Sequence, residues 1–302
     1  MSTPLVWLIT GCTSGSGLAL VHAIAVRGDS VIATGRNITS RSPSLASPSI
    51  ALLDLDIVSP LADIEAVVSH AVTLFGRIDV LVNNAGMTRV SALEEASEAF
   101  VKAIFDVNLF GAIKVTQAVL PHMRAAGTGT VVCIGAGLGW VSIPFLTHYS
   151  LTKAALTMFA EGLHKEIAPL GLRSIIFEPG GFDSQLFVPR DPSVSRAPKI
   201  ADYLPQFTKI FGSGGFVPPP GDIAKLPDTI IDVVKGEGLA RGRRVPVRVV
   251  LGPDSLDAVR QKCTEQLRLL DQWEVVSLSV MKEGARETPQ SFLDGFSILD
   301  KS

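Results

Sequence analysis

Short apolar stretches alternate along this chain with longer stretches in which apolar residues recur every three to four positions. The short stretches have the length of strands and are apolar at successive positions, as strands are when both faces of a sheet are covered. The longer ones have the period of a helix. The pattern predicts strands at residues 5–9, 30–34, 50–53, 78–82, 130–134, 172–177 and 245–251, and helices at 16–27, 61–75, 97–106, 109–125, 149–168 and 254–280.

Strands that alternate with helices predict an α/β fold with a parallel sheet. Right-handed crossovers between the strands then give a doubly wound, seven-stranded sheet. We expect residues 1–302 to form one domain. Residues 37–49 are rich in serine and proline and are predicted as a surface loop. Asp222 can cap the next helix, and Pro227 is expected to kink it.

Two segments extend beyond the repeating pattern. The segment after the sixth strand is rich in proline but carries its own apolar residues, so residues 186–221 are predicted to form a lid over a substrate site. Residues 254–302 are predicted to be a helical extension, with poor order beyond residue 280.

The first predicted strand is followed by a glycine-rich turn. Gly11 permits the tight turn, Gly15 lets the backbone approach a pyrophosphate, and Gly17 lets the following helix pack closely on the sheet. The helix N-terminus then directs free N–H groups at the phosphates. An ordinary strand–helix turn is the alternative, but the position at the first βα junction favours a dinucleotide site of the Rossmann type. The turn also contributes Thr13, Ser14 and Ser16.

The end of the second strand predicts which dinucleotide is bound. An acidic residue there would bind the ribose 2′-hydroxyl, whereas this chain has Arg36, which can pair with a 2′-phosphate. Arg41 is a possible second cation. The sequence therefore favours NADP(H). Asp54, after the third strand, can accept from the adenine amino group, or it can be an ordinary helix-start or turn aspartate.

Further motifs follow at strand and helix ends. Asn84-Ala85-Gly86 follows the fourth strand, Asn108 lies in a helix, Tyr149 and Lys153 open a later helix, and Pro179-Gly180 follows the sixth strand. Together with the glycine turn, these residues resemble the short-chain dehydrogenase/reductase family over residues 5–251. The resemblance implies an NADP(H)-dependent oxidoreductase.

The resemblance also implies roles for single residues. Tyr149 would be the acid/base, and Lys153 would hold the nicotinamide ribose. Because these two residues lie four apart on a helix, they share a face, and the ammonium is expected to lower the pKa of the phenol. Asn108 would hold a water in a proton relay, or would cap a helix kink. Residues 84–86 would line the adenine-ribose side. Phe182 and Ser184 would approach the nicotinamide amide.

One position departs from the family pattern. The serine expected thirteen residues before the tyrosine, which would bind the substrate oxygen, is Ala136. Loss of such a donor typically costs about 10²–10³ in rate. Ser142 is the nearest replacement, with Thr147 and His148 as further candidates, although an ordinary loop role is expected for each. Three functions are therefore open. The site could transfer hydride, it could carry out non-redox acid/base chemistry as an isomerase, dehydratase or cyclase, or the protein could be a silent NADP(H) sensor. We favour redox chemistry.

The remaining composition restricts partners and compartment. Apolar residues in the lid and in the loop that holds Phe145 predict a lipophilic small-molecule substrate, as in secondary metabolism. The net charge of −2 gives no reason to expect nucleic acid, and three dispersed cysteines predict neither disulfides nor a metal site and fit the cytoplasm. No membrane span is expected. The helices at 109–125 and 149–168 would pair in a homodimer or homotetramer, with a monomer still open.

Overall fold

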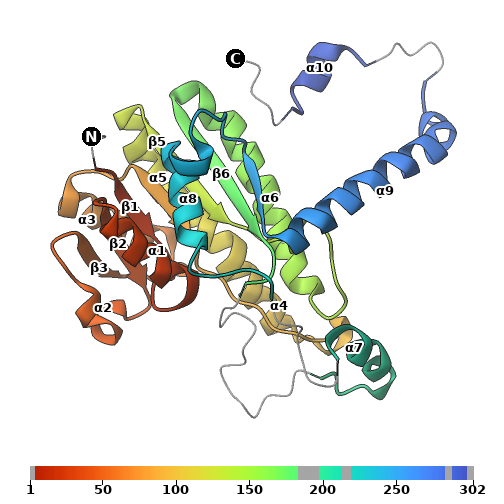
Figure 1. Ribbon diagram of the computed structural model, residues 1–302, viewed down its shortest axis with the longest axis horizontal. Coiled ribbons are helices and arrows are strands. Elements are labelled where there is room, and N and C mark those ends of the chain that lie inside the picture. The colour runs from red at the N-terminus through yellow and green to blue at the C-terminus, as the bar shows by residue number, and fades with distance from the viewer. Residues whose placement is uncertain (1–3, 183–196, 213–218, 283–287, 298–302) are drawn as a thin grey trace.

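The computed structural model describes residues 4–182, 197–212, 219–282 and 288–297. A seven-stranded, all-parallel sheet forms its centre, in the order β3-β2-β1-β4-β5-β6-β7 (Figure 1). The order reverses at β1, so the carboxyl ends of β1 and β4 flank a crevice in which ligands of such folds bind. The strands are β1 (Val6–Ile9), β2 (Ser30–Gly35), β3 (Ile50–Asp54), β4 (Val80–Asn83), β5 (Gly129–Ile134), β6 (Leu172–Pro179) and β7 (Arg248–Leu251).

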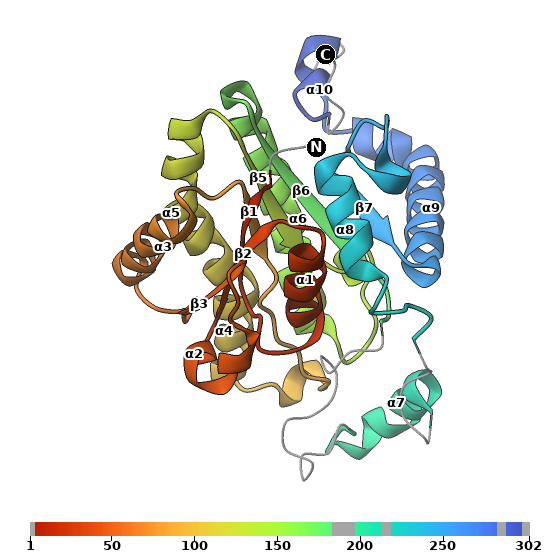
Figure 2. The same cartoon turned by 60° about the vertical axis from the view of Figure 1, so that its left-hand side comes forward.

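Helices cover both faces of this sheet, as the doubly wound prediction requires (Figure 2). Successive β1 residues point to opposite faces. Val6 and Leu8 therefore pack with α3 (Leu61–Phe75), α5 (Gly111–Ala126) and α6 (Thr147–Ile167). On the other face, Trp7 and Ile9 pack with α1 (Gly15–Val26) and α8 (Leu226–Lys235). Two buried clusters, one on each face, make up the core.

Three local predictions need correction. Residues 37–49 are not simply a loop, because they hold α2 (Ile38–Arg41) and a 3-10 turn (Pro43–Leu45), whose Ile38 and Leu45 are buried. Pro227 lies in the first turn of α8, where a missing N–H costs nothing, so it starts the helix and does not kink it. Asp222 accepts from the backbone N–H of Ala224 and so caps the turn before that helix.

The two helices predicted at 97–106 and 109–125 are one continuous rod. A π-helical turn (Asp106–Phe110) joins α4 (Glu98–Phe105) to α5. By length and composition the rod, Glu98–Ala126, is apolar enough to cross a membrane, but 44% of its most apolar window is buried in the protein. The α5 part packs on α3 and the sheet as a core helix.

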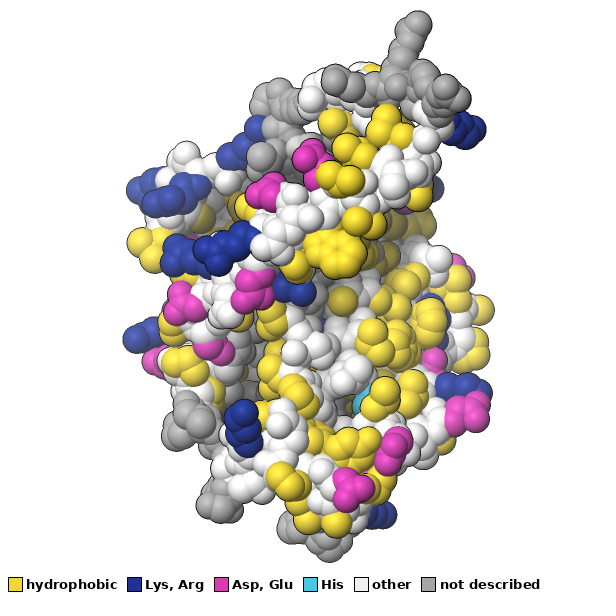
Figure 3. All heavy atoms as spheres, turned by 90° about the vertical axis from the view of Figure 1, so that its right-hand side faces the viewer, with side chains coloured by type: hydrophobic (Ala, Val, Ile, Leu, Met, Phe, Trp, Pro, Cys, Tyr) yellow, Lys and Arg dark blue, Asp and Glu magenta, His cyan; other side chains and the backbone are white. Residues whose placement is uncertain are grey.

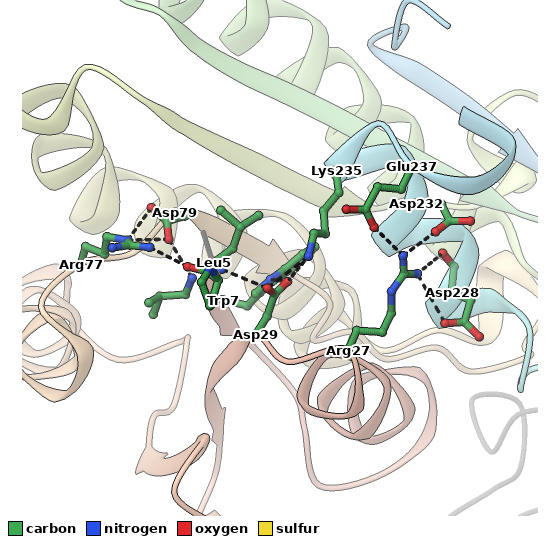
Figure 4. Close-up of polar contacts among 12 residues, drawn as sticks. Leu5, Trp7, Arg27, Asp29, Arg77, Asp79, Asp228, Asp232, Lys235 and Glu237 are labelled. Carbon is green, nitrogen blue, oxygen red and sulfur yellow. Dashed lines mark hydrogen bonds and ion pairs between the residues drawn. The ribbon is translucent and has the colours of Figure 1, made fainter. Parts of the chain in front are cut away.

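Ion pairs close the amino-terminal edge of the sheet, opposite the crevice (Figure 4). Asp29, which is 2% exposed, accepts from the Leu5 backbone, the Trp7 indole and the Lys235 ammonium, so one carboxylate holds β1 and α8 together. Arg27 pairs with Asp232 and Glu237 at 2.7 and 2.8 Å. These contacts hold α8 to α1.

The described part of the predicted lid is helical. A 3-10 turn (Ala201–Tyr203) leads into α7 (Leu204–Phe211), and the aromatic rings of α7 pack on Phe145. After β7, α9 (Pro253–Leu278) projects from the body, and the short α10 (Gln290–Asp294) follows (Figure 1). The lid residues 186–196 and 213–218 lie outside the described residues.

Candidate active site

The glycine turn has the geometry that its sequence predicts. Gly11 has φ +74°, and a Cβ there would lie 2.8 Å from the Ala85 Cα, so only glycine allows the turn to touch the segment after β4. A Cβ on Gly17 would lie 2.4 Å from the Gly11 carbonyl oxygen. The turn, α1 and the 84–86 segment are thus in backbone contact, which leaves no room for side chains between them.

The same turn leaves space where a pyrophosphate would need it. Gly15 has φ +58° and is exposed, with no atom of the described residues within 4 Å of a Cβ built on it. Within residues 4–182, Ser14 at the N-cap makes no side-chain capping bond and the first turn of α1 has no acidic residue. The α1 N-terminus therefore directs unsatisfied N–H groups at open space. Thr13 and Ser16 are half-buried beside it. These residues fit a dinucleotide phosphate.

Thr10 fixes the 84–86 segment, a role that the sequence analysis did not assign. Its hydroxyl accepts from the backbone N–H groups of both Asn84 and Ala85 at 3.0 Å. Asn84 in turn donates to the Thr10 carbonyl at 2.9 Å, and its Oδ1 lies 2.7 Å from the Ser16 hydroxyl. The segment predicted to line the adenine ribose is therefore held on the glycine turn. A threonine at the end of a buried strand was the only sequence signal.

Arg36 and Asp54 have different environments. Arg36 is exposed just after β2, and its guanidinium makes no hydrogen bond or ion pair with the described residues. Asp54 accepts from the backbone N–H and the hydroxyl of Thr39 at 3.0 and 2.8 Å, bonds that lower the pKa of its carboxyl. The structure shows a local role for Asp54, whose carboxylate fixes α2, and its contact with adenine stays a prediction.

Tyr149 and Lys153 lie on one face of α6, both 4% exposed. The Lys153 Nζ is 5.6 Å from the centre of the Tyr149 ring and donates to the Ile134 carbonyl at 2.7 Å. The expected lowering of the phenol pKa is wrong for this structure, because burial raises the pKa of Tyr149. Burial also lowers the pKa of Lys153, to about 8, which weakens the field that the ammonium would exert on the phenol.

Asn108 lies in the π-helical turn and connects it to two neighbouring segments. Its side chain accepts from the backbone N–H of Met87 at 2.8 Å and donates to the Met87 carbonyl at 2.9 Å. It also donates to the Thr152 hydroxyl at 3.0 Å. A Cβ on Gly86 would lie 3.5 Å from the Asn108 Oδ1 and 3.8 Å from the Lys153 Nζ. The asparagine and the lysine thus converge beside Gly86, and the helix irregularity supports the alternative of an asparagine at a distorted turn.

Ala136 is buried in an apolar cluster with Tyr149 and Ile104, against which Met87, Phe100, Phe105 and Leu138 also pack. Its methyl group therefore occupies the wall beside the phenol where a hydroxyl was expected. Ser142 is exposed. His148 is buried with its ring edge on Phe100, and no described residue bonds its Nε2. Within the described residues, no hydroxyl in this cluster takes the place of the missing serine.

The loop after β6, expected at the nicotinamide, is fixed from α9. The Asp254 carboxylate accepts from the Gly181 N–H at 2.7 Å and lies where a Cβ on Gly180 would be. Pro179 ends β6, and Phe182 pairs with Gly221. Ser184 lies outside the described residues. Asp254 was missed, because a residue in a tail gives no signal that it will contact a loop seventy positions earlier.

Phe145 is a packing residue in this structure. It is 6% exposed, has φ +70°, and makes ring contacts with Tyr203, Phe207 and Phe211. The structure shows that it holds α7 against the loop before α6, and its place in a substrate pocket stays a prediction.

Comparison with known proteins shows the family to which this fold belongs. The family described as short chain dehydrogenase matches residues 5–194. Oxidoreductase BOA17 of Botryotinia fuckeliana is 31% identical over 283 residues, which are 91% of this chain and 98% of that protein.

Two solved structures are similar over most of their length. A short-chain dehydrogenase from Streptomyces avermitilis is 32% identical with a TM-score of 0.78, over 93% of this chain and 100% of that one. A gluconate 5-dehydrogenase from Burkholderia cenocepacia, in complex with NADP and tartrate, is 25% identical with a TM-score of 0.67, over 84% and 95%. With its glycine turn, its tyrosine–lysine pair and these similarities, the chain belongs to the short-chain dehydrogenase/reductase family of oxidoreductases.

Proposed function

We propose that this protein is an NADP(H)-dependent oxidoreductase that acts on a carbonyl or alcohol group of a lipophilic small molecule, with Tyr149 as the acid/base. The observation that carries this proposal is the pair of buried side chains on one face of α6, Tyr149 and Lys153, beside Asn108 and Gly86 at the crevice. Buried titratable groups at a ligand crevice are typical of catalytic sites.

The cofactor would supply or accept the hydride, and the chain would handle the proton. Burial raises the pKa of Tyr149, so its hydroxyl stays protonated at neutral pH and can donate to a substrate oxygen. Lys153 is held by the Ile134 carbonyl at a distance from which its ammonium can stabilise the phenolate that remains. Asn108 fixes the Met87 backbone beside this pair.

NADP(H), in preference to NAD(H), is supported by Arg36. Its exposed guanidinium follows the second strand, has no carboxylate partner among the described residues and can bind a 2′-phosphate. On the nicotinamide side we assign Pro179, Gly180, Phe182 and Ser184, and we assign residues 84–86 to the adenine ribose.

A lipophilic substrate is supported by the surroundings of the phenol. The cluster around Tyr149 is apolar, formed by Ala136, Met87, Phe100, Phe105 and Leu138. The cations that the structure shows beside it are Lys153 at the Tyr149 ring and Arg89 over the Phe100 ring. A substrate carbonyl placed there would receive one hydrogen bond, from the tyrosine, and would gain the rest of its binding energy from apolar burial.

Ala136 also supports a second candidate, acid/base chemistry without net redox change, such as isomerisation, dehydration or cyclisation. A site that does not have to stabilise a full alkoxide needs the second donor less. In that case Tyr149 would move a proton on the bound substrate.

The experiment follows nicotinamide absorbance and product together. The protein is mixed with NADPH and a panel of long-chain and polycyclic ketones. Reduction with equal cofactor consumption is expected, and Tyr149→Phe should lower the rate by about 10²–10⁴. Tyr203→Phe, which changes the other tyrosine of the chain, is the control and should leave the rate unchanged. Product formed without cofactor consumption would assign the second candidate. No product of either kind, or full activity of Tyr149→Phe, would refute both.

A further inference from the structure

Helix α9 projects from the body (Figure 1), and several large apolar side chains on it are exposed. Every residue from Cys263 to the end of α9 at Leu278 is exposed, which at about 1.5 Å per residue is roughly 24 Å of helix. The large apolar side chains among them include Leu267, Leu270 and Trp273, which are 64%, 62% and 57% exposed. An isolated helix with so much apolar surface is marginally stable in water, so a partner surface is expected to cover it.

A groove runs between α9 and α6. It has a volume of about 480 Å³ and is lined by Ala154 and Met158 of α6, by Cys263, Leu267 and Leu270 of α9, and by Trp140 and Arg248 at its floor. Figure 3 shows this face: hydrophobic side chains gather on both sides of a hollow. Helices pack at interaxial distances of 8–10 Å, and such a groove between two diverging helices accepts a third helix.

The charges on α9 point to α9 of a second copy as that helix. Asp257, Arg260, Thr264, Arg268 and Asp271 are spaced three or four apart and form one row beside the Leu267 stripe. The ion pair between Arg260 and Asp257 is long, at 4.0 Å, and the two side chains are 70% and 79% exposed. Either side chain can therefore exchange this contact for a charged group of another molecule. When two such helices cross antiparallel near Gln266, Arg260 of each copy lies opposite Asp271 of the other, and the stripes containing Leu267 and Leu270 meet. The same register places Asp257 opposite Glu274, at the outer ends of the contact, where the two carboxylates are exposed to solvent.

We propose that α9 is a dimerisation arm: the α9 of one chain lies in the α6–α9 groove of a second copy, antiparallel to its partner, with two Arg260–Asp271 ion pairs flanking a core of Leu267 and Leu270. The contact is isologous, because each chain supplies both the arm and the groove. It uses part of the α6 face that the sequence suggests for helix pairing, at Ala154 and Met158, but covers it with α9 in place of α5, and it does not depend on the substrate or the cofactor.

An anionic membrane surface fits α9 less well. The helix carries Asp254, Asp257, Glu265, Asp271 and Glu274 against three cations, so it is net acidic, whereas helices that lie on membranes present lysine and arginine on the polar face.

The test is sedimentation velocity of the full chain. The wild type should be a dimer. Arg260→Asp should weaken the dimer about tenfold, because two attractions become two repulsions, and Asp271→Arg should do the same. The double variant Arg260→Asp/Asp271→Arg should restore the wild-type dissociation constant.

Leu267→Glu/Leu270→Glu should be monomeric. Leu239→Glu, at a 90% exposed leucine between α8 and β7, is the matched control and should remain a dimer.

All these side chains are exposed, so the circular dichroism spectrum of each variant should match that of the wild type. The unfolding temperature of the wild type should rise with protein concentration and that of the monomeric variant should not, which separates a loss of fold from a loss of pairing. A monomeric wild type, a dimer unaffected by the leucine changes, or charge variants that are not rescued by the swap would overturn the proposal. So would a wild type that is monomeric and floats with phosphatidylserine vesicles, which would assign α9 to a membrane.

Discussion

Arg248 of β7 forms an ion pair with Glu178 of β6, with the Nη2 2.7 Å from the Oε1 of a carboxylate that has no exposed surface. The same carboxylate accepts from the Trp140 indole at 2.8 Å and from the Thr157 hydroxyl at 3.0 Å. Arg248 also lies 3.6 Å from the centre of the Trp140 ring. One buried pair therefore joins the sheet edge, the loop after Ala136 and the helix that carries Lys153.

Breaking this pair from one side should be costly. Glu178→Gln leaves the partly buried Arg248 guanidinium with Glu161, at 2.9 Å, as its remaining counter-charge, and we expect a loss of up to about 3 kcal/mol in the free energy of unfolding. The double variant Glu178→Leu/Arg248→Met removes both charges and should recover much of the loss. Urea unfolding of the three proteins tests this, and a double variant less stable than Glu178→Gln would contradict it.

Restoring a hydroxyl beside Tyr149 should raise generic ketone reduction. Ala136 has φ −167°, which serine adopts easily, and lies in the cluster around the phenol. With a second donor for the substrate oxygen, kcat/KM of Ala136→Ser should rise at least about tenfold. Ala136→Cys matches the size but is a weak donor, and should give little gain. An unchanged rate for the serine variant would mean that no carbonyl is placed at this wall.

Removing the Arg36 guanidinium should change cofactor preference. Because that group would pair with a 2′-phosphate, Arg36→Ala should weaken NADPH binding by about 10- to 100-fold and leave NADH binding nearly unchanged. Arg41→Ala, a neighbouring exposed cation, is the control with a smaller expected effect. Isothermal titration measures both cofactors. Equal weakening for NADPH and NADH would remove the 2′-phosphate role.

The lowered pKa of Lys153 predicts a pH dependence of stability. In the fold this pKa is about 8, whereas an unfolded lysine titrates near ~10.4, so between these values the unfolded chain binds more protons. Stability contributed by Lys153 therefore rises with pH through that window. Relative to Lys153→Met, the wild type should gain about 2–3 kcal/mol between pH 7.5 and ~10.5. A flat difference between the two unfolding curves would contradict the burial effect.

Substitution by alanine should have opposite effects at a glycine of the turn and at a glycine on a helix surface. A Cβ on Gly17 meets the Gly11 carbonyl at 2.4 Å, so Gly17→Ala should shift the turn and abolish nucleotide binding. Gly162 on α6 has ordinary backbone angles and no described atom within 4 Å of such a Cβ. Gly162→Ala should therefore add about 0.5–1 kcal/mol of stability and keep binding intact. Thermal unfolding and cofactor fluorescence distinguish the two, and normal binding by Gly17→Ala would refute the packing argument.

The sequence by itself determined the fold and predicted most of the residues of the candidate site. Local period and length specify strands and helices, and a parallel sheet brings the ends of its strands to one edge, so the glycine turn, residues 84–86, Tyr149 and Lys153 could be placed without coordinates. The same reasoning applies to Ala136. It lies thirteen residues before Tyr149, where the family pattern has a serine, so the sequence predicts that this hydroxyl is missing.

Only the tertiary structure decided the environments of these residues. Burial raised the pKa of Tyr149 and lowered that of Lys153, and the local bond to Thr39 fixed Asp54. Asp254 reached Gly181, and Glu178 reached Arg248, over seventy or more positions. Desolvation and hydrogen bonding depend on which distant atoms surround a group, and that arrangement is set by the packing of the whole chain, which no local pattern contains.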